Sequence, residues 1–299
     1  MRHKSKARIF NGLILIIIFA TISYAKGIDL KKIPKPEEWV GEKVIFRPRP
    51  EILQKYGYAS YSYSKGNSLQ YPSYFNLVEK TAIIEKVTRD FLNINVVLKI
   101  EDSNKLLYTK ANGNTLESIG FFSEMEKAKK YIGKTVWNKK NKLQTYNPDE
   151  YLTPKIGIKG KYEEIPIKNL EKLTVVKIEW GWFTNPLRFY LKTKDGKVGF
   201  WDGSYSRIND TFNNLLEPFD ENWYLQNPYK IHPSWDKKTW KAIEKNKIYI
   251  GMNKEMVLMS WGKPKDINRT VGSWGSHEQW GYDSQYLYFE NNKLTSFQD

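Results

Sequence analysis

Short runs of β-branched and aromatic residues, separated by turn-forming residues, occupy most of the first two thirds of the chain. Ile83 to Val87 and Val175 to Ile178 are two such runs. Arg188 to Leu191 leads into Lys194-Asp195-Gly196-Lys197, whose Asp-Gly pair is typical of a tight hairpin before Val198 to Trp201. This pattern predicts short antiparallel strands.

The strand pattern occurs twice. Three segments return in the same order: residues 40–46 at 132–137, residues 78–84 at 170–176, and residues 97–102 at 190–195. Gly41 and Gly133 lie 92 positions apart, the second pair of segments has the same shift, and the third has a shift of 93. Such matches indicate a duplicated β module, with copy one at residues 38–130 and copy two at 131–222.

Each copy is expected to hold about five short strands, with a long loop after the first. This arrangement resembles a small SH3-like barrel. Copy one is expected to end in a short helix, because Ser123-Glu124-Met125-Glu126 has the spacing of a capping box.

Six tyrosines lie in the long loop of copy one: Tyr56, Tyr58, Tyr61, Tyr63, Tyr71 and Tyr74. In SH3-like barrels this loop often shapes the ligand groove, where tyrosines stack on sugar or proline rings. Tyr58, Tyr61 and Tyr63 are therefore candidate binding residues. The alternative, which the alternating spacing favours, is that the tyrosines line a strand face and pack into the core. Trp180 and Trp182 of copy two have the same two interpretations.

The pattern changes in the last third of the chain. Residues 223–233 contain two prolines and are expected to form a linker. Ser234 is suited to cap a helix that runs to about Lys245. A second helix is predicted to start after Asn253, its N-cap, and to end at Gly262. The remaining residues predict an antiparallel meander: strands at 279–282, 286–289 and 294–298.

These helices and strands carry a recognisable motif. It consists of Gly251-Met252-Asn253-x-x-x-Val257-x-x-x-Trp261-Gly262-x-Pro264, then Gln279-Trp280-x-Tyr282, then Tyr286-x-Tyr288-Phe289-Glu290-Asn291-x-Lys293-Leu294-Thr295-Ser296. With this motif, residues 234–299 resemble the SmpA/OmlA (BamE-like) domain. The resemblance implies an α+β domain in which two helices pack on a three-stranded antiparallel sheet.

The resemblance also implies a setting in the cell envelope. The best-known members of the family are outer-membrane lipoproteins that assist the assembly of barrel proteins and bind anionic lipid. This chain differs from them because it lacks the lipidated cysteine and carries the duplicated module. The candidate binding residues at family-matched positions are Trp261, Trp280, Tyr282 and Tyr288, each of which also suits core packing.

The N-terminus predicts export. Four basic residues precede an apolar run from Leu13 to Ala20, and Ser23-Tyr24-Ala25 offers small residues at the positions that signal peptidase reads. Residues 1–25 are therefore expected to be a signal peptide cleaved after Ala25, followed by a linker at 26–37. An uncleaved anchor is the alternative, but the run is short of the roughly 20 apolar residues that span a bilayer. We expect no other transmembrane segment.

Charge and cysteine content narrow the classes of partner. The whole chain has a formal net charge of +15, which becomes +11 without the four basic residues of the signal. This excess suits an anionic membrane or cell-wall surface or an acidic protein face, although a merely soluble basic surface would show it too. Nucleic acid is a poor candidate for an exported protein. The chain has no cysteine, which excludes disulfides and a lipoprotein anchor.

The sequence offers little for catalysis, for a metal ion or for a cofactor. Its three histidines are His3, His232 and His277, and no two of them have ligand spacing. No phosphate-binding or dinucleotide-binding fingerprint occurs. The carboxylate pairs Glu163/Glu164 and Asp220/Glu221 could serve a glycosidase, but adjacent residues rarely point to one site.

The sequence therefore predicts a periplasmic or secreted, non-enzymatic protein of the bacterial cell envelope, which acts as a binding, scaffolding or assembly accessory factor. Two alternatives stay open. One is a glycan- or peptidoglycan-binding module built on the tyrosine-rich loop, and the other is an unrecognised secreted hydrolase.

Overall fold

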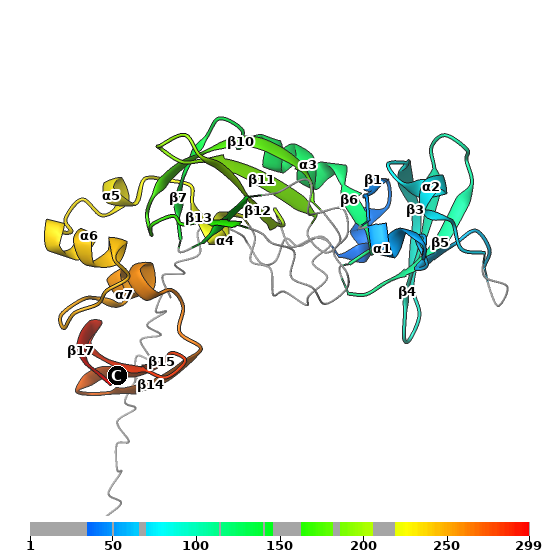
Figure 1. The fold of residues 1–299 in the computed structure, drawn as a ribbon. Coiled ribbons are helices and arrows are strands. Elements are labelled where there is room, and N and C mark those ends of the chain that lie inside the picture. The colour runs from blue at the N-terminus through cyan, green and yellow to red at the C-terminus, as the bar shows by residue number, and fades with distance from the viewer. Residues whose placement is uncertain are drawn as a thin grey trace, which may run out of the picture.

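The protein is mostly β-structure: two curled half-barrel sheets, a third sheet and a few helices (Figure 1). The computed structural model describes residues 35–49, 51–65, 70–113, 115–139, 141–145, 163–181, 186–205 and 219–298. The expected signal peptide and most of the linker at 26–37 lie outside these residues. In the described part, no helix combines the length and the apolar character needed to cross a membrane.

The first sheet has six strands in the order β2-β5-β4-β3-β1-β6. Its strands are β1 (Lys43–Phe46), β2 (Tyr61–Ser62), β3 (Thr81–Arg89), β4 (Ile94–Ile100), β5 (Leu106–Ala111) and β6 (Ile119–Phe121). The short helices with it are a 3-10 turn (Pro36–Trp39), α1 (Glu51–Gln54) and α2 (Tyr74–Leu77). Alternate residues of β4 are buried, so one face of the sheet supplies the first hydrophobic core.

The second sheet has seven strands in the order β13-β7-β10-β11-β12-β8-β9. They are β7 (Thr135–Asn138), β8 (Leu143–Thr145), β9 (Glu163–Ile165), β10 (Lys172–Trp180), β11 (Leu187–Lys192), β12 (Val198–Gly203) and β13 (Trp223–Tyr224). α3 (Phe122–Lys129) leads into this sheet, and α4 (Phe219–Asn222) precedes its last strand. The predicted Asp-Gly hairpin joins β11 to β12, with Gly196 at a φ of 91°.

Five strands of the two sheets share one order, because β5-β4-β3-β1-β6 corresponds to β12-β11-β10-β7-β13. In both, the third strand is reached through a non-glycine residue of positive φ, Glu79 (62°) and Leu170 (61°). The N–H groups of these two residues donate to the carbonyls of Phe46 and Asn138. Phe46 and Asn138 are 92 positions apart, whereas Glu79 and Leu170 are 91 positions apart. The predicted shift of 92 between residues 78–84 and 170–176 was therefore wrong by one residue.

Two boundaries of the β modules differ from the sequence prediction. Trp223 and Tyr224, expected in a linker, form β13 and pair with β7, and Trp223 is fully buried. α3 starts at Phe122, directly after β6, so Ser123 lies inside the helix and does not cap it. The prediction failed there because strand and helix follow each other with no loop, and a capping box assumes a non-helical residue at its first position.

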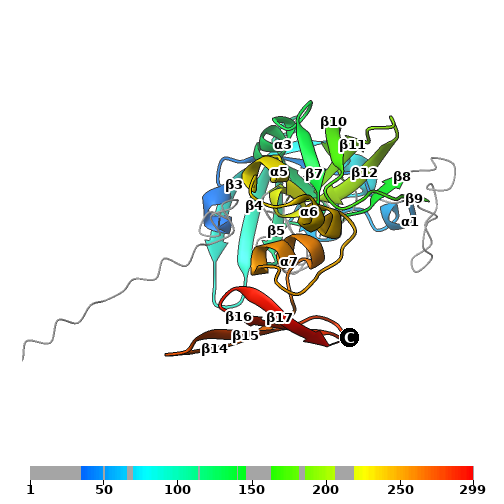
Figure 2. The ribbon, with the colours of Figure 1, turned by 90° about the vertical axis from the view of Figure 1, so that its left-hand side faces the viewer.

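The third sheet has four strands, one more than expected: β14 (Asp266–Gly272), β15 (Gly275–Gly281), β16 (Tyr286–Glu290) and β17 (Lys293–Gln298). β14 was missed because all seven of its residues are exposed and show no buried-face alternation. α6 (Lys237–Glu244) and α7 (Lys254–Trp261) lie between this sheet and the second sheet (Figure 2). α5 (Pro228–Ile231) precedes them.

The helix ends of this domain are set by side-chain caps. Asn253 accepts a hydrogen bond from the N–H of Met256 (2.8 Å) and Gly262 follows α7 at a φ of 83°, as the sequence predicted. α6 instead starts two residues later than expected, because Asp236, rather than Ser234, accepts from the N–H of Thr239 (2.7 Å).

Buried polar side chains join the three parts. Arg47 is fully buried and donates to the carbonyls of Ile119 in copy one (3.0 Å) and Gly181 in copy two (3.0 Å). Asn169 donates its two amide hydrogens to the carbonyls of Ile243 in α6 (3.0 Å) and Met259 in α7 (2.9 Å). Both carbonyls lie near the helix ends, and that of Ile243 also accepts from the Asn246 N–H just after α6 (3.0 Å).

We predict that Asn169→Ala detaches the C-terminal domain from copy two without unfolding either part. The substitution removes both hydrogen bonds and leaves the Met259 carbonyl without its donor, at a cost of about 1–3 kcal/mol, whereas the Ile243 carbonyl keeps the Asn246 N–H. Calorimetry should show one unfolding transition of the wild-type protein separate into two in the variant. Asn76→Ala removes an exposed amide from α2 and should leave the trace unchanged. A single unshifted transition in Asn169→Ala would contradict the prediction.

Candidate functional site: the edge and open face of the C-terminal sheet

Tyr58 and Tyr61 lie in the first core and not on a ligand surface. Each is only 1% exposed, and their rings pack against Phe46 at 5.3 and 5.1 Å between centroids. The Tyr58 hydroxyl donates to the Arg47 carbonyl (2.8 Å), and the Tyr61 hydroxyl donates to the Glu117 carbonyl (2.7 Å). Burial raises the pKa of both phenols. The packing alternative therefore holds for these two residues.

The other candidates of the β modules do not form a common site with them. Tyr63 is half-buried against the first core and has the Lys105 ammonium 5.7 Å from its ring centroid. Trp180 packs edge-on against Phe122 (5.5 Å), and a Cβ on Gly120 would collide with its ring. Trp180 thus belongs to the contact between the two copies. Trp182 lies outside the described residues.

Three of the four candidates in the C-terminal domain also have structural contacts. Trp280 is 3% exposed, packs on Phe289 (4.5 Å) and donates to Glu278 (2.9 Å). Trp261 and Tyr282 meet at 5.4 Å in an edge-to-face contact. Tyr288 differs from them because it lies on the sheet face opposite the helices.

This open face carries a row of hydrogen-bonded polar side chains across all four strands. The Asn268 amide donates to Gln279 (3.2 Å), and the Gln279 amide donates to the Tyr288 hydroxyl (3.1 Å). The Tyr288 hydroxyl donates in turn to Gln298 (3.3 Å). His277 lies beside this row, with its ring 6.2 Å from that of Tyr288. The row makes the open face polar and preorganised for hydrogen bonding.

The outer edge of the sheet is formed by β14. Its register with β15 runs without a break from Asp266↔Gly281 to Gly272↔Gly275. The Asn291 N–H donates to the Ser276 carbonyl, so the backbone groups of Ser276 point toward β16. Backbone groups alternate in direction along a strand, and those of His277, Gln279 and Gly281 therefore point toward β14 and pair with it. The N–H and C=O groups of Ile267, Arg269 and Val271 therefore point away from the sheet.

The opposite edge, at β17, is protected. The Leu294 carbonyl accepts from the Gly251 N–H (2.8 Å), and the Leu294 N–H donates to Met252 (2.8 Å). Asn253 adds an isolated bridge to Lys293, and the register between β16 and β17 contains an irregularity. Covering segments and bulges are the usual ways in which proteins block an edge. β14 has neither among the described residues, which makes it the accessible edge.

Glu278 anchors β14 to the domain. Its carboxylate is 2.8 Å from the Lys254 ammonium at the start of α7 and 3.2 Å from Arg269 in β14. Burial opposes its ionisation, but the hydrogen bonds from Lys254 and Trp280 outweigh burial and hold the pKa of this carboxyl below its usual value. The edge strand is therefore held in place through side chains, while its outward backbone groups have no partner among the described residues.

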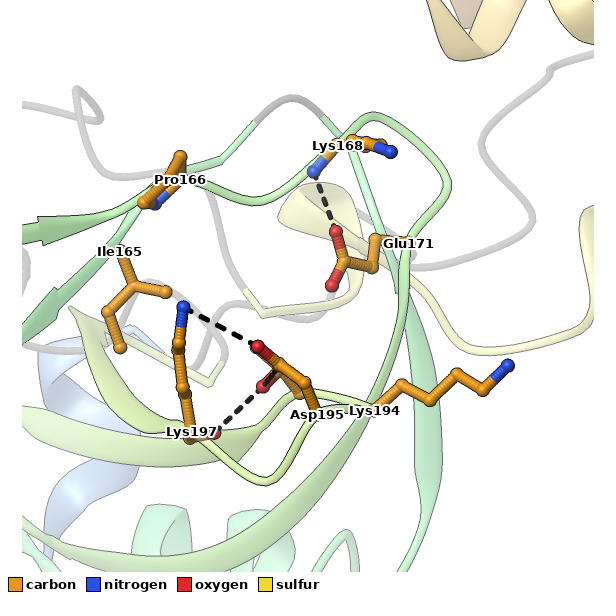
Figure 3. A pocket seen from close by; sticks show the side chains of 8 residues that line it. Ile165, Pro166, Lys168, Glu171, Lys194, Asp195 and Lys197 are labelled. Atoms are coloured by element: carbon orange, nitrogen blue, oxygen red, sulfur yellow. Dashed lines mark hydrogen bonds and ion pairs between the residues drawn. The ribbon is translucent and has the colours of Figure 1, made fainter.

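A separate opening of about 410 Å³ lies at one end of the second sheet (Figure 3). Asp195 forms an ion pair with Lys197 (3.4 Å), and the Lys168 N–H donates to Glu171 (2.9 Å). The two carboxylates of the lining, Asp195 and Glu171, thus each have a partner of their own. No group of three or more metal-binding side chains occurs within the described ranges.

Comparison of the chain with protein-family models, with curated proteins and with solved structures gives no match.

We predict that acid weakens the C-terminal domain through Glu278. A carboxyl with a depressed pKa stabilises the fold above its unfolded value of 4.5, and this contribution is lost as the pH falls through the lower folded value. Glu278→Gln should therefore cost about 1–3 kcal/mol at neutral pH and flatten the acid limb of the stability profile. Denaturant unfolding between pH 7 and 3 measures both effects. The exposed Glu290→Gln serves as the control, and an unchanged acid limb in Glu278→Gln would refute the assignment.

Proposed function

We propose that this protein is an exported, non-enzymatic accessory factor of the cell envelope, which docks an extended segment of a protein partner on β14. In this proposal the two curled sheets are SH3-like modules that hold an SmpA/OmlA-like domain at the end of the molecule. The observation that carries it is the edge of the C-terminal sheet, where no described residue pairs with the outward backbone groups of Ile267, Arg269 and Val271.

Strand addition fits the chemistry of this edge. An added strand satisfies backbone groups on both sides, and pockets for alternate side chains supply specificity. Ile267 and Val271 lie on the helix side of the sheet and are 54% and 66% exposed. Asn268 and Thr270 lie on the open, polar side. The partner segment should therefore alternate, with apolar side chains beside Ile267 and Val271 and polar ones beside Asn268 and Thr270.

Other features support the envelope setting. The basic N-terminus, the apolar run at 13–20 and the small residues at 23–25 have the order of a secretory signal. The glycan-binding alternative loses support, because it depended on Tyr58 and Tyr61, which lie in the first core.

The test compares two substitutions at one edge position. Val271→Pro removes an outward N–H and adds no clash with the β15 ladder, whereas Val271→Thr keeps the N–H and changes only the side chain. Both proteins are expressed in the native host, crosslinked in the cell, and analysed by mass spectrometry. We predict that crosslinks from residues 264–275 to an envelope protein are lost in Val271→Pro and kept in Val271→Thr.

Two results would contradict the proposal. One is an equal crosslink pattern in wild-type protein and Val271→Pro, which would exclude the edge as the docking site. The other is sedimentation with peptidoglycan and no crosslinked protein partner, which would favour a cell-wall ligand on the β modules.

A further inference from the structure

A pair of bare apolar side chains forms the tip of the β3–β4 hairpin. Phe91 is 100% exposed and Leu92 is 83% exposed, so neither is covered by the described part of the chain. The last rung of the hairpin is Arg89↔Ile94, which leaves both residues beyond the end of the ladder. In Figure 1 this hairpin projects from the first sheet as a narrow finger. A convex tip of this kind offers no groove for a ligand. Its two apolar side chains could instead insert into a membrane or into a pocket of another protein.

The turn beneath the tip is fixed. The Asp90 carboxylate accepts hydrogen bonds from the backbone N–H groups of Leu92 (2.9 Å) and Asn93 (2.8 Å). It also accepts from the side-chain amides of Asn93 (3.1 Å) and Asn95 (2.9 Å). These bonds lower the pKa of Asp90 to about 2, so the turn keeps its bonds across the physiological range. The backbone that presents Phe91 and Leu92 is thus already ordered, which lowers the ordering cost at binding.

Two free cations lie behind the tip on one face of the sheet. Lys110 is opposite Asn95, and Lys86 is opposite Val97 on the neighbouring rungs. Asn95 and Val97 are two residues apart in β4, so both lysines share the face that points away from the first core. Neither has an acidic partner in the described part of the chain, whereas Arg89 is paired with Glu37 (2.8 Å).

We propose that this hairpin tip docks on an anionic phospholipid bilayer, with Phe91 and Leu92 inserted among the headgroups and acyl chains. The convex shape and the two exposed side chains suit shallow insertion, and polar residues on the flanking rungs suit the headgroup layer. Lys86 and Lys110 reach anionic headgroups, and the net charge of +11 that the chain carries without residues 1–25 adds attraction over a longer range. This site is independent of the β14 edge.

Vesicle binding tests this proposal. The protein that begins at residue 26 keeps every described residue and lacks the apolar run at 13–20, which could bind lipid by itself. We expect it to sediment with vesicles of 30% phosphatidylglycerol in phosphatidylcholine more than with phosphatidylcholine alone. Phe91→Ser and Leu92→Ser should each weaken binding about tenfold, the loss expected from one buried apolar side chain. Lys86→Gln with Lys110→Gln should weaken binding only at low salt.

The absence of cysteine from the chain allows a direct depth measurement. Leu92→Cys labelled with an environment-sensitive nitrobenzoxadiazole dye should shift its emission to the blue on anionic vesicles. Phe75→Cys with the same dye is the matched control, since Phe75 is 78% exposed on α2 and should show no shift. Binding that Phe91→Ser leaves unchanged, equal shifts at both positions, or no vesicle binding at all would overturn the proposal. Self-association abolished by Phe91→Ser would also overturn it, in favour of a second copy.

Discussion

The architecture depends most on the buried side chain of Asn169. One primary amide holds the second curled sheet to two helices at once, by donating to Ile243 in α6 and Met259 in α7. The neighbouring Leu170 is 3% exposed and belongs to the hydrophobic core of the C-terminal domain. Its backbone lies in the left-handed region, at a cost of roughly 1–2 kcal/mol. Burial of the leucine side chain, about 1.5–3 kcal/mol, offsets that cost.

The same turn of copy one has a different role. Glu79 occupies the place of Leu170 with almost the same φ, and its side chain is exposed. In each copy the N–H of this residue donates to the carbonyl at the end of the first strand, of Phe46 or of Asn138. The two turns therefore have the same backbone hydrogen bond and differ in their side chains. Copy two thus docks a domain on this turn, while copy one leaves the turn in solvent. Copy one is joined to copy two through Arg47, whose guanidinium donates a hydrogen bond to the Gly181 carbonyl.

Sequence reasoning identified the features that local chemistry sets. The Asp195-Gly196 turn, the Asn253 cap and the stop at Gly262 each depend on a few adjacent residues, and all three occur as expected. The strand at Trp223 was missed because its identity depends on β7, more than 80 residues earlier in the chain. The tyrosine-rich loop had two interpretations, a ligand groove or core packing, and only the burial of the side chains distinguishes them. β14 gave no signal because it lacks a buried face, and that absence is what makes it a candidate site.

The central claim is that β14, at one end of the molecule, is a strand edge to which a partner segment can add. Amide hydrogen exchange of the isolated protein, read residue by residue, tests that claim most directly. We predict fast exchange for Ile267, Arg269 and Val271 and slow exchange for Asn268 and Thr270, whose N–H groups pair with β15. The fast group should become protected when the partner binds. Slow exchange of all five amides in the isolated protein would show that this edge is already occupied, and would contradict the account.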